Sequence, residues 1–142
     1  MKTSTPRVVR STPPSTDQRP AGAERLAAPA LRAFFAIAAR WGLSAAQQRT
    51  LLGSPPSSTF FKWKKEQGGN LPRDVLERIS YVLGIYKALQ ILLPEPERAD
   101  RWITTPNAAP LFGGGTALER MLAGNVGDLF AVRQYLDAQR GG

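Results

Sequence analysis

Residues 44–66, SAAQQRTLLGSPPSSTFFKWKKE, decide how the first half of this chain folds. Ser44 is a good N-cap for a short helix over residues 45–52, and Gly53 ends that helix. After a turn that contains two prolines, residues 58–66 carry apolar side chains at helical spacing. The stretch therefore predicts two short helices joined by a tight turn, which is the layout of a helix-turn-helix.

The second helix of such a motif lies in the major groove of DNA. Its first turn here carries small hydroxyl side chains, which can bond to phosphates or base edges, and its later turns carry lysines, which can neutralise phosphates. These candidate DNA-binding residues are Ser57, Ser58, Thr59, Lys62, Lys64 and Lys65. We expect Phe60 or Phe61, together with Trp63, to face the core.

Two observations leave open a helix pair that binds no DNA. Helix-turn-helix geometry also occurs in ordinary helical bundles. In addition, Pro55 and Pro56 stand where Leu-Gly-x-Ser is the usual turn, and proline removes backbone donors and stiffens the approach to the second helix. The net basic charge of the chain weighs toward DNA, and we expect the motif to bind an operator.

Helical patterns continue on both sides of this stretch, and no segment alternates apolar and polar residues as a half-buried strand would. Residues 1–24, rich in proline, serine and threonine, predict a disordered tail. Capping boxes are expected at Thr116 with Glu119 and at Asn125 with Asp128. The predicted fold is all-α, and the further helices run from Arg25 to about Trp41, from Pro72 to about Leu93, and over residues 97–103, 117–123 and 126–139. The predicted division is a helix-turn-helix bundle followed by a small helical domain, over residues 25–93 and 94–142.

Composition excludes several classes of function. The 142 residues include no cysteine and no histidine, and the net charge is +8 with a sequence pI of about 10.6. Disulfides, the common nucleophile–base pairs and the best zinc sites therefore cannot form, and we expect neither an enzyme nor a bound metal or other cofactor. The charge suits a polyanion, nucleic acid first. The sequence has no run of about 20 apolar residues and no signal-like apolar stretch, so a cytoplasmic protein is expected.

Three separated motifs mark the last third of the chain. They are Trp102 with Thr105-Pro106-Asn107, the loop Phe112-Gly113-Gly114, and a terminal helix with Ala131-Val132-Arg133 and Tyr135-Leu136-Asp137. Together they resemble the Xre/MbcA/ParS family of bacterial antitoxins, and the resemblance covers about residues 26–142. It implies an Xre-like helix-turn-helix followed by a toxin-binding domain.

The resemblance also implies a partner, a RES-domain toxin that consumes NAD and whose NAD pocket the C-terminal region of the antitoxin covers. The toxin contacts expected from it are Trp102, Asn107, Phe112, Phe130, Arg133, Tyr135, Asp137 and Arg140. It further implies repression of the antitoxin's own operon, as a homodimer within a hetero-oligomer. Two alternatives stand beside this interpretation. The last helix packs only on the chain's own core, or the protein is a stand-alone regulator whose C-terminal domain serves dimerisation.

Overall fold

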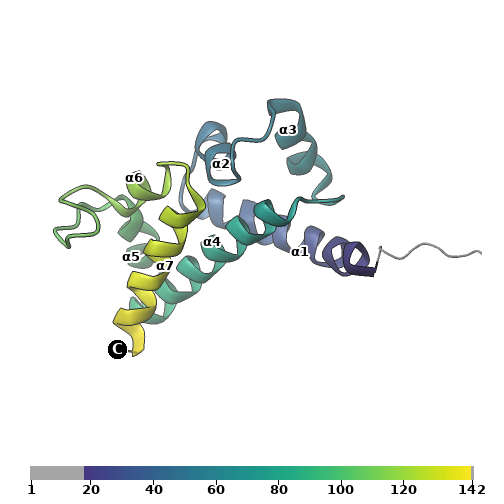
Figure 1. Ribbon diagram of the computed structural model, residues 1–142. Helices are drawn as coiled ribbons and strands as arrows, with labels where there is room; N and C mark the ends of the chain where they lie inside the picture. The colour runs from purple at the N-terminus through teal and green to yellow at the C-terminus, as the bar shows by residue number, and fades with distance from the viewer. Residues whose placement is uncertain (1–17, 142) are drawn as a thin grey trace, which may run out of the picture.

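The computed structural model describes residues 18–141, with side chains from Leu26 onward, and this part of the chain contains helices and no strand. The prediction of an all-α fold is confirmed. Figure 1 shows α4 running through the middle of the molecule, with α2 and α3 near its start and α7 beside it. In order, the elements are α1 (Gln18–Arg40), α2 (Ala45–Leu51), α3 (Ser57–Glu66), α4 (Arg73–Leu92), α5 (Pro96–Arg101), the 3-10 turn η3 (Trp102–Thr104), α6 (Ala117–Met121) and α7 (Val126–Gly141).

Helix α1 begins earlier than the sequence pattern predicts. It starts at Gln18 rather than at Arg25, so part of the predicted disordered tail is helical, and residues 1–17 lie outside the described residues. Pro20 does not prevent this start because it lies in the first turn, where its missing N–H would have no partner within the helix.

Helix α4 is the element on which both halves of the chain are built. It packs most extensively against α7, and next against α1. Its buried apolar side chains belong to one continuous core that includes residues of α1, α3, α6 and α7; they are Val75, Ile79, Val82, Ile85, Ala88 and Leu89. Leu76, Leu83 and Tyr86 of the same helix are partly buried against this core. The predicted domain boundary after residue 93 thus falls just after a helix that packs against both halves of the chain.

Two of the predicted helix starts have the expected capping. The Ser44 hydroxyl accepts a hydrogen bond from the backbone of Gln47, whose side chain bonds back to Ser44. Thr116 and Glu119 form the same reciprocal pair at α6.

The start of α7 differs from the prediction of a capping box. The carboxylate of Asp128 accepts a 2.7 Å hydrogen bond from Arg120 Nε instead of capping its own helix. Arg120 also donates to the carbonyl of Leu111, at 3.2 Å. Arg120 of α6 therefore links the first turn of α7 to Leu111, in the loop before α6. The Asp128 carboxylate serves this tertiary contact.

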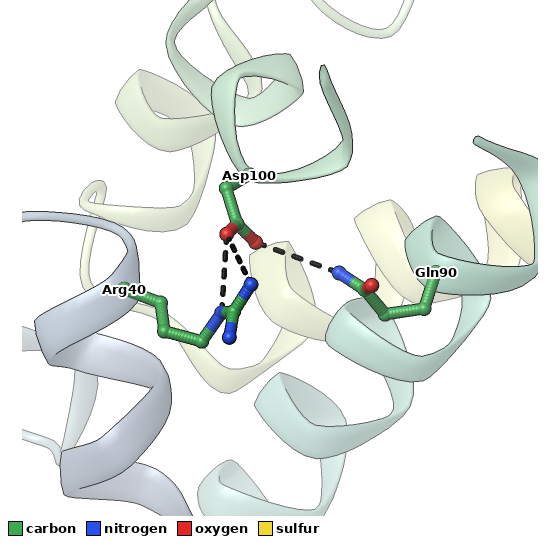
Figure 2. Close-up of polar contacts among 3 residues, drawn as sticks. All are labelled: Arg40, Gln90 and Asp100. Atoms are coloured by element: carbon green, nitrogen blue, oxygen red, sulfur yellow. Dashed lines mark hydrogen bonds and ion pairs between the residues drawn. The ribbon is translucent and has the colours of Figure 1, made fainter. Parts of the chain in front are cut away.

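A polar cluster fixes α5 against two earlier helices, and Figure 2 shows Arg40 of α1 and Gln90 of α4 both directed at Asp100. Arg40 Nε and Nη2 lie 3.1 and 3.0 Å from Asp100 Oδ2, and Gln90 Nε2 lies 3.5 Å from Oδ1. The hydrogen bond to Asp100, followed by the charge of that carboxylate, raises the pKa of Arg40, whose guanidinium also lies 5.9 Å from the centre of the Tyr86 ring. The C-terminal half is therefore joined to the helix-turn-helix half by charge as well as by the core.

Candidate functional site

The turn between α2 and α3 accommodates its two prolines. Gly53 and Ser54 have φ of +93° and +58°, and Ser54 N–H bonds to the carbonyl of Arg49 at 2.9 Å. The Arg49 side chain donates in turn to the carbonyl of Pro55. Two features favour glycine at position 53. Its φ lies in the left-handed region, and a Cβ there would touch the ion pair of Arg78 with Asp74. The turn with its two prolines is thus held by two hydrogen bonds to Arg49, and α3 begins after it at Ser57.

Helix α3 has one buried and one open face. Phe60 is fully buried and Trp63 is 7% exposed, which confirms that these two rings face the core, whereas Phe61 is 53% exposed. Of the predicted DNA-binding residues, Thr59 is half-buried and the others are exposed: Ser57, Ser58, Lys62, Lys64 and Lys65. Helical spacing places Ser58, Phe61, Lys62 and Lys65 on the outer face, opposite Phe60 and Trp63.

The structure adds detail to the positions of Lys64 and Phe61. Lys64 Nζ lies 5.9 Å from the centre of the Phe35 ring of α1, so this lysine points to the flank of α3 rather than along its outer face. The prediction left open which of the two adjacent phenylalanines is buried, and the structure buries Phe60 and leaves Phe61 on the surface. Its ring stands edge-on to Phe60, with the ring centres 5.0 Å apart.

Three of the predicted toxin contacts form an aromatic cluster, which we define as Trp102, Phe112 and Tyr135. Trp102 and Tyr135 are stacked with ring centres 6.4 Å apart, and Phe112 meets them edge-on at 5.8 and 5.2 Å. Phe112 is buried and the other two are partly buried. The aromatic cluster therefore joins η3, the following loop and α7, and most of its ring surface is used inside the protein.

Asn107 closes the base of the same loop. Its N–H donates to the carbonyl of Gly115 at 2.8 Å, and its own carbonyl accepts from Gly114 N–H at 3.0 Å. Its side-chain oxygen accepts from the N–H of Ala109 at 2.8 Å. The backbone groups and the side-chain oxygen of Asn107 are thus engaged in folding the loop, which Figure 1 shows extending away from the helices between η3 and α6.

The remaining predicted toxin contacts lie along the other edge of α7. Phe130 is 46% exposed, and its ring meets Tyr81 of α4 edge-on at 5.7 Å between centres. Asp137 lies between two arginines, 3.4 Å from Arg133 Nε and 3.5 Å from Arg140 Nη1. The structure therefore brings the eight predicted contacts together in two groups of four, one on each side of α7, and not in a single patch.

Tyr81 adds a polar group to this second edge. Its hydroxyl donates to Glu77 Oε2 at 3.0 Å, and this hydrogen bond, followed by burial, raises the pKa of Tyr81. The single hydroxyl proton of Tyr81 is therefore engaged with Glu77. Sequence reasoning missed Tyr81 because its partner Phe130 is far away along the chain.

Within residues 18–141, no three acidic side chains gather closely enough to hold a metal ion. None of the helices in that range combines the length and the apolar character needed to cross a membrane.

Two family models match the chain in the order that the sequence motifs indicated. The antitoxin Xre-like helix-turn-helix domain matches residues 20–84, and the antitoxin Xre/MbcA/ParS C-terminal toxin-binding domain matches residues 88–142. An uncharacterized protein of Sinorhizobium fredii (strain NBRC 101917 / NGR234), y4oB, is 56% identical over 134 residues, which are 94% of this chain and 97% of that protein. The chain belongs to the Xre/MbcA/ParS family of antitoxins, with a helix-turn-helix followed by a toxin-binding domain.

Proposed function

We propose that this antitoxin neutralises a RES-domain toxin that degrades NAD, by covering the toxin's active site with its C-terminal region. The observation that carries the proposal is the placement of α7, which lies within the matched toxin-binding domain and keeps Phe130 and Arg140 exposed. Aromatic and arginine side chains are enriched among residues that dominate binding energy in interfaces. NAD carries a pyrophosphate, so its pocket should be rich in cations or donors, with which Asp137 can pair, while Arg140 would meet an acidic rim of the pocket.

The test uses the RES-domain protein encoded beside this chain's gene. Expressed alone it should deplete NAD and arrest growth, and the full-length antitoxin should restore both. An antitoxin lacking residues 133–142 should fail to protect. If the truncated protein inhibits NAD turnover as well as the full chain does, coverage of the active site by the C-terminal region is refuted. If it does not inhibit, its melting temperature shows whether it fails to bind the toxin or fails to fold.

We propose in addition that the antitoxin represses its own operon through α3. The outer face of α3 combines a hydroxyl with two lysines, Ser58, Lys62 and Lys65, beside exposed Phe61. Lysines on such a helix neutralise DNA phosphates, and binding should therefore weaken steeply with salt. A mobility-shift titration with the DNA upstream of the gene tests this proposal, and equal affinity for unrelated DNA of the same length would contradict it.

Binding of a two-fold operator calls for two copies of the motif, so we propose a homodimer within a hetero-oligomer with the toxin, acting in the cytoplasm where operator and NAD are found. The other candidate is a stand-alone regulator whose C-terminal domain serves dimerisation. The neighbouring reading frame distinguishes the two, because the stand-alone regulator needs no RES-domain protein. Co-purification of the two gene products supports the antitoxin, and the absence of any RES-domain protein encoded beside this gene supports the regulator.

A further inference from the structure

We infer that α4, a helix of the helix-turn-helix half, supplies part of the surface to which the toxin docks, through Tyr81 and Ile91. This inference rests on the proposed neutralisation of a toxin and extends the docking surface beyond the matched toxin-binding domain, since Tyr81 precedes residue 88. We call this surface the outer groove. It lies between α4 and α7 and is lined by Tyr81, Ile91, Phe130, Arg133, Asp137 and Arg140.

The first argument is uncovered apolar surface. Among the described residues, the large apolar side chains that remain exposed are Leu26, Phe61, Ile91 and Phe130, and the last two belong to the outer groove. Ile91 is 51% and Phe130 46% exposed, and both lie next to charged side chains of α7. A patch of this kind, apolar side chains rimmed by polar groups, is typical of a protein-binding surface.

The second argument comes from the opposite edge of α7. The groove there is lined in part by Trp102 and Tyr135, together with Leu89, Leu92 and Leu93. Its two rings are stacked on each other, and Phe112 covers them further. No exposed large apolar side chain lies on that edge within the described residues. The large apolar side chains on the opposite edge are therefore covered by packing within the protein, whereas Ile91 and Phe130 in the outer groove remain exposed.

The third argument is that α4 and α7 run side by side in the same direction, which makes the outer groove one continuous surface. Tyr81 meets Phe130, Gly84 meets Arg133, and Ile91 lines the same hollow as Arg140. The absence of a side chain at Gly84 lets the Arg133 side chain lie across α4, since a Cβ there would overlap its guanidinium group. Apolar groups from both helices and charged groups from α7 thus line one surface.

The charges of the outer groove indicate the chemistry of that partner. Arg133 and Arg140 share the single carboxylate of Asp137, so the two arginines carry one positive charge more than their acceptor neutralises. A toxin surface with an apolar patch and at least one carboxylate beside it would complement this arrangement. The basic charge of the whole chain, +8, would favour the same acidic partner surface during encounter.

The test measures the affinity of full-length antitoxin variants for the purified RES-domain protein encoded beside this gene, by biolayer interferometry. Tyr81→Ala and Ile91→Arg should each weaken binding by about tenfold or more, as expected for central interface residues. Because Ile91 is half-exposed, Ile91→Arg should leave the melting temperature unchanged, so it keeps the test decisive if Tyr81→Ala proves unstable. Tyr81 and Phe130 substituted together should show coupling in a double-mutant cycle.

Two controls introduce the same arginine elsewhere. Leu26→Arg removes an exposed aliphatic side chain of α1, and Gln139→Arg changes the opposite edge of α7, and both should bind the toxin like the wild type. Failure of the wild type to bind would refute the proposed function itself. If the wild type binds the toxin and Ile91→Arg binds it equally well, the inference is refuted while the proposed function stands. The same holds if Gln139→Arg is the one variant that loses binding. A wild-type dimer that Ile91→Arg converts to a monomer, with toxin affinity unchanged, would assign the outer groove to a second antitoxin copy and overturn the inference.

Discussion

Replacing Gly84 with alanine tests the outer groove through a single methyl group inside α4. Alanine is favoured over glycine in a helix interior by about 1 kcal/mol. The heavy atoms nearest to the added Cβ all belong to the distal part of the flexible Arg133 side chain, so Arg133 should swing away from α4 while the backbone stays in place. The ion pair of Arg133 with Asp137, 3.4 Å long and half-exposed, would then be broken, at a cost of about 0.3–0.5 kcal/mol.

The two terms leave a net stabilisation of about 0.5 kcal/mol, which for a chain of this size raises the melting temperature by about 2 °C. Toxin affinity should move in the opposite direction and fall by about tenfold, since Arg133 no longer presents its guanidinium in the outer groove. Thermal unfolding followed by circular dichroism and a binding titration with the RES-domain protein measure both quantities on the same sample.

A matched control is Gly127→Ala in the first turns of α7, where an added Cβ meets nothing within 4 Å. It should leave toxin affinity unchanged and stabilise the fold slightly. The reasoning fails if Gly84→Ala lowers the stability by more than about 1 kcal/mol, because the backbone and not the arginine tip would then have to move. It fails equally if the variant is stable and binds the toxin as tightly as the wild type.

Three further predictions concern other parts of the molecule. Replacing Lys62 and Lys65 together with alanine should lower the slope of log affinity against log salt by about 0.9 for each phosphate that α3 no longer neutralises; a mobility-shift series over several salt concentrations checks it, and an unchanged slope would exclude α3 as the DNA-reading helix. Removing residues 140–142 should weaken inhibition of the toxin's NAD turnover while operator affinity is kept, and inhibition equal to that of the full chain would show that these last residues take no part in covering the active site. Asp100→Asn should weaken the interaction with Arg40 and lower the melting temperature, more at low than at high salt, and a variant as stable as the wild type at both salt concentrations would show that the cluster adds no stability.

The helices could be predicted from the sequence because their signals are local. The caps at Ser44 and Thr116 and the spacing of buried residues in α4 lie within a few residues of each other along the chain. The start of α1 was misplaced because Pro20 breaks a helix only beyond the first turn, and sequence alone did not show that Pro20 lies in that turn.

The candidate sites were harder to predict because they depend on contacts between distant residues. The motifs identified Trp102 and Tyr135 as important but did not show that their rings stack on each other. Nor could they pair Tyr81 with Phe130, or show that Arg40 and Asp100, 60 positions apart, form an ion pair. Periodicity tells which side of a helix is apolar, whereas only the packed structure tells which edge of it is already covered.

The packing of α4 between the two halves has a consequence for how this antitoxin would be destroyed. Leu89 of α4 and Leu129 and Leu136 of α7 are fully or almost fully buried in one core, so loss of α7 exposes the helix on which the helix-turn-helix bundle is built. Folding of the two halves is then expected to be a single cooperative event. Cleavage of α7 by a cellular protease would therefore unfold both halves together. The proposed toxin binding and operon repression would then be lost at the same rate, so that free toxin and renewed transcription would arise together.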